Sequence, residues 1–336
     1  MSFYIIIFLI LLFLSFRKYN KYVYWGTLLF LSAIAGLRNE TIGVDTHSYK
    51  SIFTWISNGI IYLIEPGWYF LNDWIASIGL SFNVLLWIAS LLTLIPLGIV
   101  CLRCSVNPQM SLFFYYGLYG YLNSFNQMRQ FVAISFVLLA YSYIFRKKFF
   151  LACFLLAVSF HYSSVISLII LYFKRIYLTR SRVIFGVLIS FLLGLILTDS
   201  MFVLLAGPYA GYLDSDAVYR DNFLYTIMLS ILMNLLYIFS FSTLEKECRQ
   251  NLWTKIFFLA IVLLNLTMQL KLGSRIILYF TYSQIIFYPM YFQHNIIKDK
   301  KIVITCILLY TALIFMKILV LGNQSDGSVY PYKTYL

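Results

Sequence analysis

The chain has 336 residues, of which 62% are hydrophobic and 11% charged, and its formal net charge is +13. A soluble domain carries about 25% charged residues, so this surplus of apolar side chains exceeds what one globular core can bury, and we expect a bilayer around most of the chain. Most basic residues lie in short loops between apolar runs, which is the usual orientation signal of membrane proteins. We therefore exclude nucleic acid as a partner.

Apolar runs recur along the whole chain and predict membrane helices. A helix needs about 20 residues to cross a bilayer, and shorter ones can be buried in a bundle. The expected spans are 2–16, 22–37, 82–102, 109–124, 129–145, 149–173, 182–198, 223–241, 254–271, 275–292 and 302–321. The sequence thus predicts an all-α polytopic integral membrane protein of about 10–12 transmembrane helices, forming a single domain over residues 1–336.

Two stretches do not fit a simple span. Residues 149–173 are either one long span or two half-helices that meet near His161. Residues 60–78 are apolar but contain Glu65, Pro66, Gly67 and Asp73, so we expect a re-entrant or surface-lying segment there. If residues 60–78 do not cross the membrane, and residues 149–173 enter it and come back to the same side, every basic cluster falls on the cytoplasmic side. The longest outer loops are then 38–59 and 199–222, and we expect the functional face on the outer side.

Three arginines stand at the outer ends of predicted spans, against this charge rule. They are Arg38, Arg129 and Arg275. Each could be an anchor whose long side chain reaches the headgroups. As a set, they would also suit an anion such as a lipid-linked pyrophosphate, because guanidinium groups bind phosphate bidentately and helix N-termini attract anions.

Two carboxylates in the outer segments are candidates for acid–base chemistry. Asp45 lies in "GVDTHSY" and could act as a general base, orient a sugar hydroxyl or hold a metal, unless it is only a solvated loop residue. Glu65 lies before a Pro–Gly turn in an apolar neighbourhood. Burial would raise its pKa, although a carboxylate that caps a helix is the plainer interpretation. His47 follows Asp45 by two residues, which does not make a metal site.

A histidine and a polar turn complete the candidate residues. His161 lies midway through an apolar segment, where an ionisable residue is a functional candidate by default, or else joins two helices by hydrogen bonds. The turn "NSFNQMRQ" places Gln127, Arg129 and Gln130 at the start of a span and favours a ligand role. We expect no metal and no cofactor. The five cysteines lie within or beside apolar segments, so neither disulfides nor zinc are expected.

Four of these stretches occur together in a known family. "GLRN…GVDTHSYKSIF", "EPGWYFLN", "MRQFVAISFVLLAYSYIFRKKFF" and "FHYSSVISL", in this order over residues 30–175, resemble the EpsG family of bacterial exopolysaccharide proteins and the Wzy-type polymerases of O-antigen and capsule. The family pattern maps onto a set of residues here, namely Arg38, Asp45, Tyr49, Glu65, Arg129, Gln130 and His161. Asn39–Glu40 departs from it, since an aromatic residue is common after the arginine.

The resemblance implies a glycosyltransferase at the outer leaflet of the bacterial cytoplasmic membrane. It would polymerise polyprenyl-pyrophosphate-linked oligosaccharide repeat units into O-antigen, capsule or exopolysaccharide, with the bilayer and the lipid-linked oligosaccharide as partners. A chain-length regulator protein is a partner that the sequence leaves open. On this hypothesis Arg38, Arg129 and Arg275 hold the pyrophosphate. The base that deprotonates the acceptor is His161, Glu65 or Asp45, and the sequence does not choose among them.

Three other functions share part of this pattern. An O-antigen ligase uses the same donor but usually has a larger outer loop late in the chain than 199–222. A metal-dependent glycosyltransferase with a polyprenyl-phosphate-sugar donor would use an acidic pair in the first outer loop, and Glu40 with Asp45 could form one. A flippase or transporter of lipid-linked sugars would show internal repeats and matched broken helices, and no convincing repeat is present.

Overall fold

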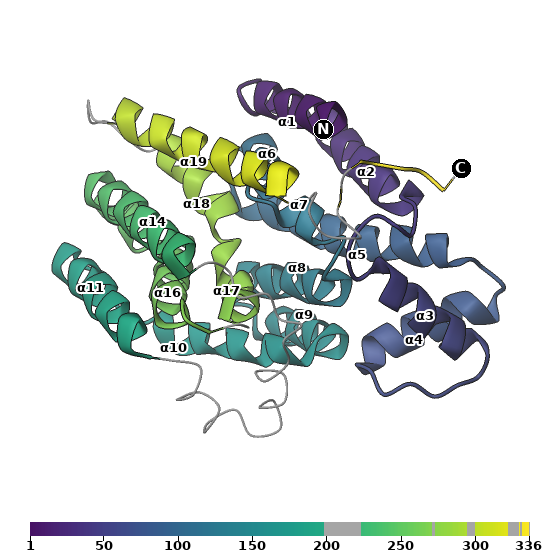
Figure 1. Ribbon diagram of the computed structural model, residues 1–336. Coiled ribbons are helices and arrows are strands. Elements are labelled where there is room, and N and C mark those ends of the chain that lie inside the picture. The colour runs from purple at the N-terminus through teal and green to yellow at the C-terminus, as the bar shows by residue number, and fades with distance from the viewer. Residues whose placement is uncertain (198–222, 271–272, 294–299, 322–328, 330, 336) are drawn as a thin grey trace. The chain divides into compact units, whose positions relative to one another are not determined.

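The computed structural model describes residues 1–197, 223–270, 273–293, 300–321, 329 and 331–335, and α-helices form nearly all of its regular structure (Figure 1). In chain order the helices are α1 (Ser2–Ser15), α2 (Lys21–Leu37), α3 (Thr46–Ser57), α4 (Pro66–Ser77), α5 (Phe82–Cys104), α6 (Pro108–Gly117), α7 (Gly120–Asn123), α8 (Met128–Ser142), α9 (Lys147–Phe160), the 3₁₀ helix η1 (Tyr162–Ile169), α10 (Ile170–Phe173), α11 (Arg180–Ile196), α14 (Phe223–Thr243), α15 (Lys246–Arg249), α16 (Leu252–Leu266), α17 (Gly273–Thr281), α18 (Gln284–Gln293) and α19 (Lys300–Leu321). The all-helical class predicted from the apolar runs is confirmed.

Most of the helices coincide with expected spans, but many are short. In the part of the chain that the structure describes, two helices are long and apolar enough to cross a membrane by themselves: α5 and residues Thr226–Thr243 of α14. Two expected spans are divided, 109–124 into α6 and α7, and 275–292 into α17 and α18. The number of crossings and the outer position of the functional face therefore remain predictions.

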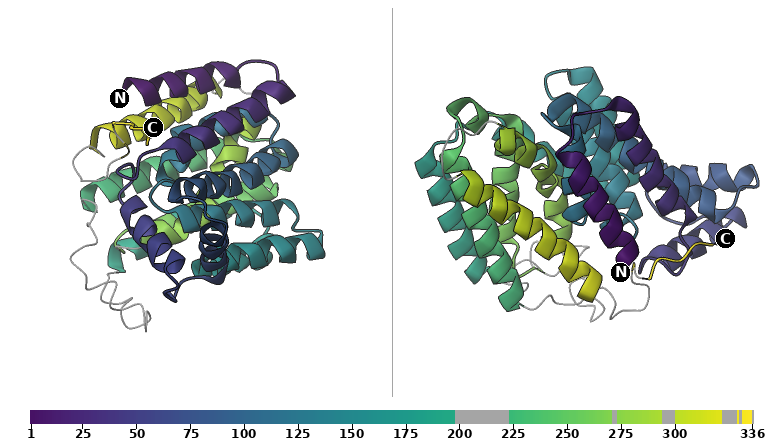
Figure 2. Two further views of the ribbon diagram at one scale, coloured as in Figure 1. Left: turned by 90° about the vertical axis from the view of Figure 1, so that its right-hand side faces the viewer. Right: turned by 90° about the horizontal axis from the view of Figure 1, so that it is seen from above.

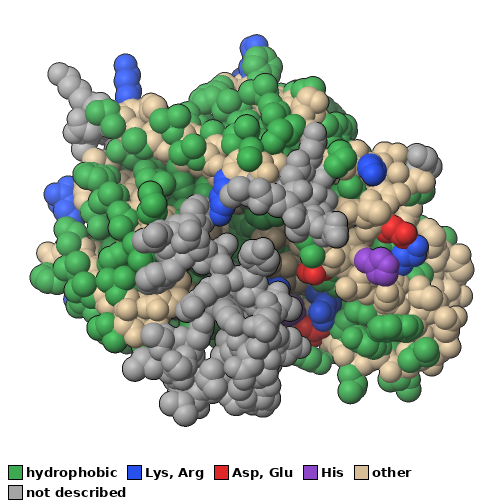
Figure 3. Space-filling view, in the orientation of Figure 1, with side chains coloured by type: hydrophobic (Ala, Val, Ile, Leu, Met, Phe, Trp, Pro, Cys, Tyr) green, Lys and Arg blue, Asp and Glu red, His purple; other side chains and the backbone are tan. Residues whose placement is uncertain are grey.

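Hydrophobic side chains dominate the face shown in Figure 3, with charged ones in small groups. After the first turn of α11, its exposed residues are all large and apolar, including Ile184, Phe185, Leu188, Ile189 and Leu192. Water would not favour such a surface, whereas lipid tails would. The chain is therefore a membrane protein.

The chain forms two compact units, the first comprising Met1–Val165 with Leu308–Leu336 and the second Ile166–Ile307. In the first unit α5 packs against α2 and α8, and α8 packs against α9. In the second unit α16 packs against α11, α14 and α17. The prediction of one transmembrane domain over the whole chain is not tested by this division.

The two irregular stretches resolve into short pieces. The segment 149–173 is indeed broken near His161: α9 ends at Phe160, His161 is extended with φ −158° and ψ 114°, and η1 follows. The segment 60–78 contains α4, whose 12 residues are too few to cross a bilayer.

The first outer loop is not a loop throughout, which corrects the prediction for 38–59. It contains α3, which packs against α4, as Figure 1 also shows. The buried side chains of α3 include Tyr49, Ile52, Phe53 and Ile56, and their spacing of three, one and three positions is that of one helix face. The other expected outer loop, 199–222, lies outside the described residues.

The last described residues return to the beginning of the first unit, where Figure 1 shows them beside the end of α2. Arg38 and Thr334 form an isolated antiparallel bridge, and the backbone N–H of Asn39 donates to the Lys333 carbonyl at 2.8 Å. The Tyr332 hydroxyl donates to the carbonyl of Ile34 in α2 at 2.8 Å. Residues 332–335 are thus joined to α2 and to the residues that follow it through both backbone and side chain.

Candidate functional site

Three of the predicted residues meet in the first unit, at the adjoining ends of α4, α8 and α9. Glu65 accepts from both of its neighbours: the Arg129 guanidinium donates Nη1–H to Oε2, and Nδ1 of His161 lies 2.7 Å from Oε1. The Glu65 side chain is 8% exposed, against 27% for Arg129 and 26% for His161. A buried carboxylate therefore has two half-buried basic partners, which retain access to the surface.

The local sequence explains how Glu65 reaches this place. Pro66 is the first residue of α4, where its fixed φ and missing N–H suit a helix start, and Glu65 stands at the N-cap. Gly67 lies so close to α9 that a Cβ there would be 2.6 Å from the Ser159 Oγ and 2.8 Å from its carbonyl oxygen. The absence of a side chain at position 67 thus lets the start of α4 rest on the end of α9, next to His161.

The charges decide the ionisation of Glu65. Burial alone would raise its pKa, but the hydrogen bond from His161 and the positive charge of Arg129 outweigh it, so the pKa lies below its ordinary value. The expectation of a raised pKa is wrong, because the sequence could not show these two partners. An ionised carboxylate only accepts hydrogen bonds, so Nδ1 of His161 carries a proton and, in the neutral ring, Nε2 is the acceptor.

Arg129 also adjoins an aromatic ring, which in turn contacts a second one. The guanidinium carbon lies 5.9 Å from the ring centroid of Tyr49, and Tyr49 makes an edge contact with Trp68 at 5.4 Å. Burial raises the pKa of the Tyr49 phenol, which stays neutral as a result. Trp68 was not among the predicted site residues, although Trp68, Asn72 and Ile75 are the buried residues of α4 and follow helical spacing.

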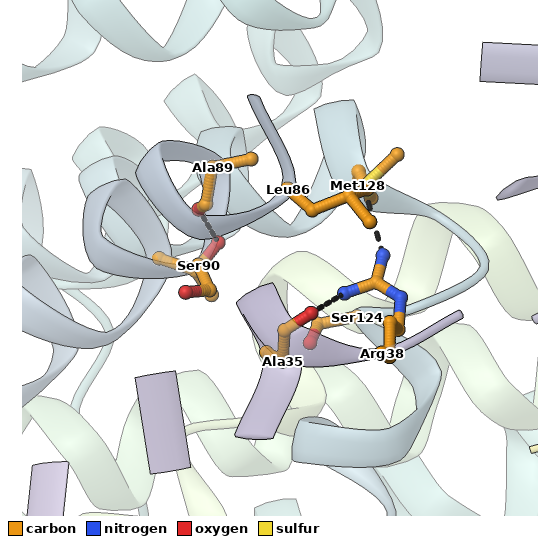
Figure 4. Close-up of a pocket in the computed structure, with 8 residues that line it drawn as sticks. Ala35, Arg38, Leu86, Ala89, Ser90, Ser124 and Met128 are labelled. Atoms are coloured by element: carbon orange, nitrogen blue, oxygen red, sulfur yellow. Dashed lines mark hydrogen bonds between the residues drawn. The ribbon is translucent and has the colours of Figure 1, made fainter. Parts of the chain in front are cut away.

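Arg38 occupies a different, buried position in the first unit (Figure 4). Its guanidinium donates to the Ala35 carbonyl at 2.6 Å and to the Met128 sulfur at 3.1 Å, and lies 4.5 Å from the Phe125 ring centroid. The residue is 1% exposed. The adjoining cavity has a volume of about 10 Å³, roughly what one water molecule needs. Burial lowers the Arg38 pKa to about 10, so it remains charged at neutral pH.

The remaining predicted residues are dispersed. Asp45 is half-buried at the N-cap of α3, where its side chain makes no capping bond. Gln130 is buried in α8. Arg275 belongs to the second unit, where it is exposed on α17. The roles assigned to these residues from sequence remain predictions.

The polar turn before α8 has a structural task that the sequence did not indicate. The side-chain oxygen of Asn126 accepts the backbone N–H of Val44 at 2.8 Å. A Cβ added at Gly43, whose φ is +96°, would lie 3.0 Å from the same Asn126 oxygen. Part of the polarity in "NSFNQMRQ" thus serves to hold the loop that leads into α3.

The first outer segment also contains an exposed ion pair between Glu40 and Lys50. In the residues that the structure describes, no three His, Cys, Asp or Glu side chains come together as a metal site would require. Glu40 therefore pairs with a lysine, and this ion pair explains a carboxylate at position 40 without a metal.

Sequence comparison extends well beyond the four motifs. A family model described as the EpsG family matches residues 27–334, which run from within α2 to beyond the end of α19. The chain belongs to the EpsG family. EpsG proteins are a Wzy-like family of polysaccharide polymerases, so the resemblance noted from the sequence is confirmed. Comparison with curated proteins and with solved structures gives no match.

Proposed function

We propose that this EpsG-family protein polymerises polyprenyl-pyrophosphate-linked oligosaccharide repeat units at the outer leaflet of the bacterial cytoplasmic membrane. The observation that carries the proposal is the group formed by Arg129, Glu65 and His161, which combines a cation for a phosphate with an oriented imidazole. Family membership supports the polymerase class. The donor, the leaflet and the residue roles are our inference.

His161 is the general base in this scheme. Its Nε2 takes the proton of the acceptor sugar hydroxyl as the hydroxyl oxygen attacks the anomeric carbon of the donor sugar. A glycosidic C–O bond forms, and the bond between that carbon and the pyrophosphate oxygen breaks. The electron pair leaves with the polyprenyl pyrophosphate, and the proton remains on His161 until it passes to solvent.

Glu65 acts through His161 and is a positioning residue. Its carboxylate holds the imidazole ring with Nδ1–H directed at Glu65. It also stabilises the imidazolium that forms during the reaction, as the acid does in a Ser–His–Asp triad. Of the three bases that the sequence left open, His161 therefore fits best. Glu65 is already engaged by two partners, Arg129 and His161.

Arg129 binds the pyrophosphate. Its side chain is partly exposed, so an incoming phosphate oxygen can reach the guanidinium. As the bond to the donor sugar breaks, negative charge accumulates on the leaving group. A fixed guanidinium stabilises that charge more than it stabilises the bound substrate.

The test is complementation of a strain that lacks this gene, read as a gel of surface polysaccharide. The wild-type gene restores polymer, whereas Arg129→Ala and His161→Ala leave a single repeat unit outside the cell. Lys50→Ala is the control, since its exposed ion pair with Glu40 lies apart from the reaction and such pairs contribute little. Polymer in the deletion strain would refute the proposal, and a repeat unit retained inside the cell would instead indicate a flippase.

A further inference from the structure

The second unit contains a cavity of about 620 Å³ between the loop before α11, the end of α14 and the short helix α15. Small-molecule sites in proteins have volumes of about 300–1,000 Å³. Three basic side chains and one acidic one line it: Arg180, Lys246 and Arg249 with Glu245. The sum of these charges is +3 − 1 = +2, so the cavity favours an anion.

The two arginines of the cavity bind the same carbonyl oxygen. Arg180 and Arg249 each donate an Nη2–H to the carbonyl oxygen of Ser242, both at 2.8 Å. One guanidinium is enough to satisfy a carbonyl at a helix C-terminus. The second guanidinium places two positive charges close together. Burial and the charge of Arg180 both lower the pKa of Arg249. The Nε of Arg249 is buried without a hydrogen-bond partner.

The cavity walls are fixed in advance of any ligand. Gln250 bonds reciprocally with Leu178: its Oε1 accepts the backbone N–H at 3.1 Å and its Nε2 donates to the carbonyl at 2.7 Å. Lys255 donates to the carbonyl of Lys174 at 2.9 Å. The loop before α11 is thereby tied to the segment around α15, and a ligand would lose little free energy in ordering them.

The surrounding helices indicate the depth of the cavity in a bilayer. Figure 2 shows α11 and α14 alongside each other, and they are in contact. The cavity adjoins the start of α11 and the end of α14. Directly beyond these ends both helices expose apolar side chains, such as Phe185 and Phe239. A charged cavity next to two lipid-facing surfaces lies at the level of the headgroups.

We propose that this cavity binds the phosphate of a membrane lipid headgroup, held by Arg180 and Arg249. A phosphate oxygen has the geometry that guanidinium groups prefer, and its negative charge relieves the repulsion between them. The site is separate from the Glu65 group and does not depend on the polymerase proposal. A soluble phosphate compound shares the recognition chemistry, and the experiment must distinguish the two sources.

The experiment is lipid binding by the purified full-length protein, followed by native mass spectrometry. The probes are dioctanoyl phosphatidic acid, dioctanoylglycerol, which has the same tails without phosphate, and inorganic phosphate. We expect phosphatidic acid to bind, dioctanoylglycerol not to bind, and inorganic phosphate to compete only weakly. Arg180→Gln and Arg249→Gln each weaken phosphatidic acid binding about tenfold or more, the effect of losing a charged hydrogen bond.

Arg146→Gln is the matched control, because it removes an exposed arginine from a loop of the first unit. Equal weakening by Arg146→Gln, or no binding by the wild type, overturns the proposal. Inorganic phosphate that binds as tightly as phosphatidic acid overturns the assignment to a lipid. If Arg249→Gln does not fold, Arg180→Gln carries the test alone, since Arg180 is exposed at the cavity, and unchanged binding in that variant overturns the proposal.

Discussion

Replacing Gly67 with alanine tests whether the close approach of α4 to α9 creates the Glu65–His161 contact. The new Cβ would lie 2.8 Å from the Ser159 carbonyl oxygen, whereas ordinary contact begins at 3.4 Å, so the helices must separate by about 3.4 − 2.8 = 0.6 Å. The carbonyl cannot rotate away as a side chain could. Overpacking of this kind costs about 1–3 kcal/mol.

The displacement acts directly on the site, because Glu65 stands two residues before the substituted position. Moving a catalytic group by about 1 Å can reduce a rate about a hundredfold, so we expect polymerisation to fall about tenfold or more. The assay combines the polysaccharide gel of the complemented deletion strain with the amount of protein in the membrane and its thermal unfolding in detergent.

Two further variants make this prediction specific. Gly26→Ala is the control: Gly26 lies in α2 with nothing within 4 Å of its Cβ position, and alanine there should stabilise the helix by up to about 1 kcal/mol. Adding Ser159→Ala to Gly67→Ala removes the contact with Oγ but not the one with the carbonyl, so we expect only partial recovery. If Gly67→Ala behaves like Gly26→Ala, our account of the α4–α9 contact is wrong.

Three other predictions follow from the same contacts. Arg129→Lys should lose most polymer while the protein still accumulates, because a single ammonium cannot both pair with Glu65 and donate to a phosphate as the guanidinium fork does; full polymer on the gel would count against that role. Because Glu65 has a lowered pKa in the folded protein, its contribution to stability is complete above the ordinary glutamate pKa of about 4.3 and is lost as the pH falls through the folded value. The difference in Tm between wild type and Glu65→Gln should therefore shrink as the pH falls below about 4. Arg38→Lys should destabilise the protein by about 1–3 kcal/mol, since lysine cannot reach both Ala35 and Met128; loss of polymer with an unchanged Tm would place Arg38 at the substrate instead.

The positions of the helices could be predicted from the sequence because apolar length is a local property. The break at His161 was one of two alternatives that the sequence left open, since a polar group in an apolar run is visible without knowing its neighbours. The helix α3 was missed because it lies in a charged segment, where its short apolar face is less conspicuous than the charges around it.

The membership of the candidate site could be predicted better than its geometry. Glu65 is 64 positions from Arg129 and 96 from His161, and no periodicity connects residues so far apart. The pKa of Glu65 was therefore predicted with the wrong sign. Arg38 was expected at the interface because a charge at the end of a span usually faces water, and its carbonyl, sulfur and aromatic partners are visible only in three dimensions.

The contact of residues 332–335 with the end of α2 has a consequence for biosynthesis. The backbone of Arg38 obtains its bridging partner, Thr334, only after nearly 300 further residues have left the ribosome, and the Tyr4 hydroxyl waits equally long for the Val329 carbonyl. Until then, membrane insertion leaves the first unit unfinished. A ribosome that stops early would release a chain whose first unit lacks these contacts, and quality-control proteases could recognise it. A bulky group fused after residue 336 would interfere with the same contacts.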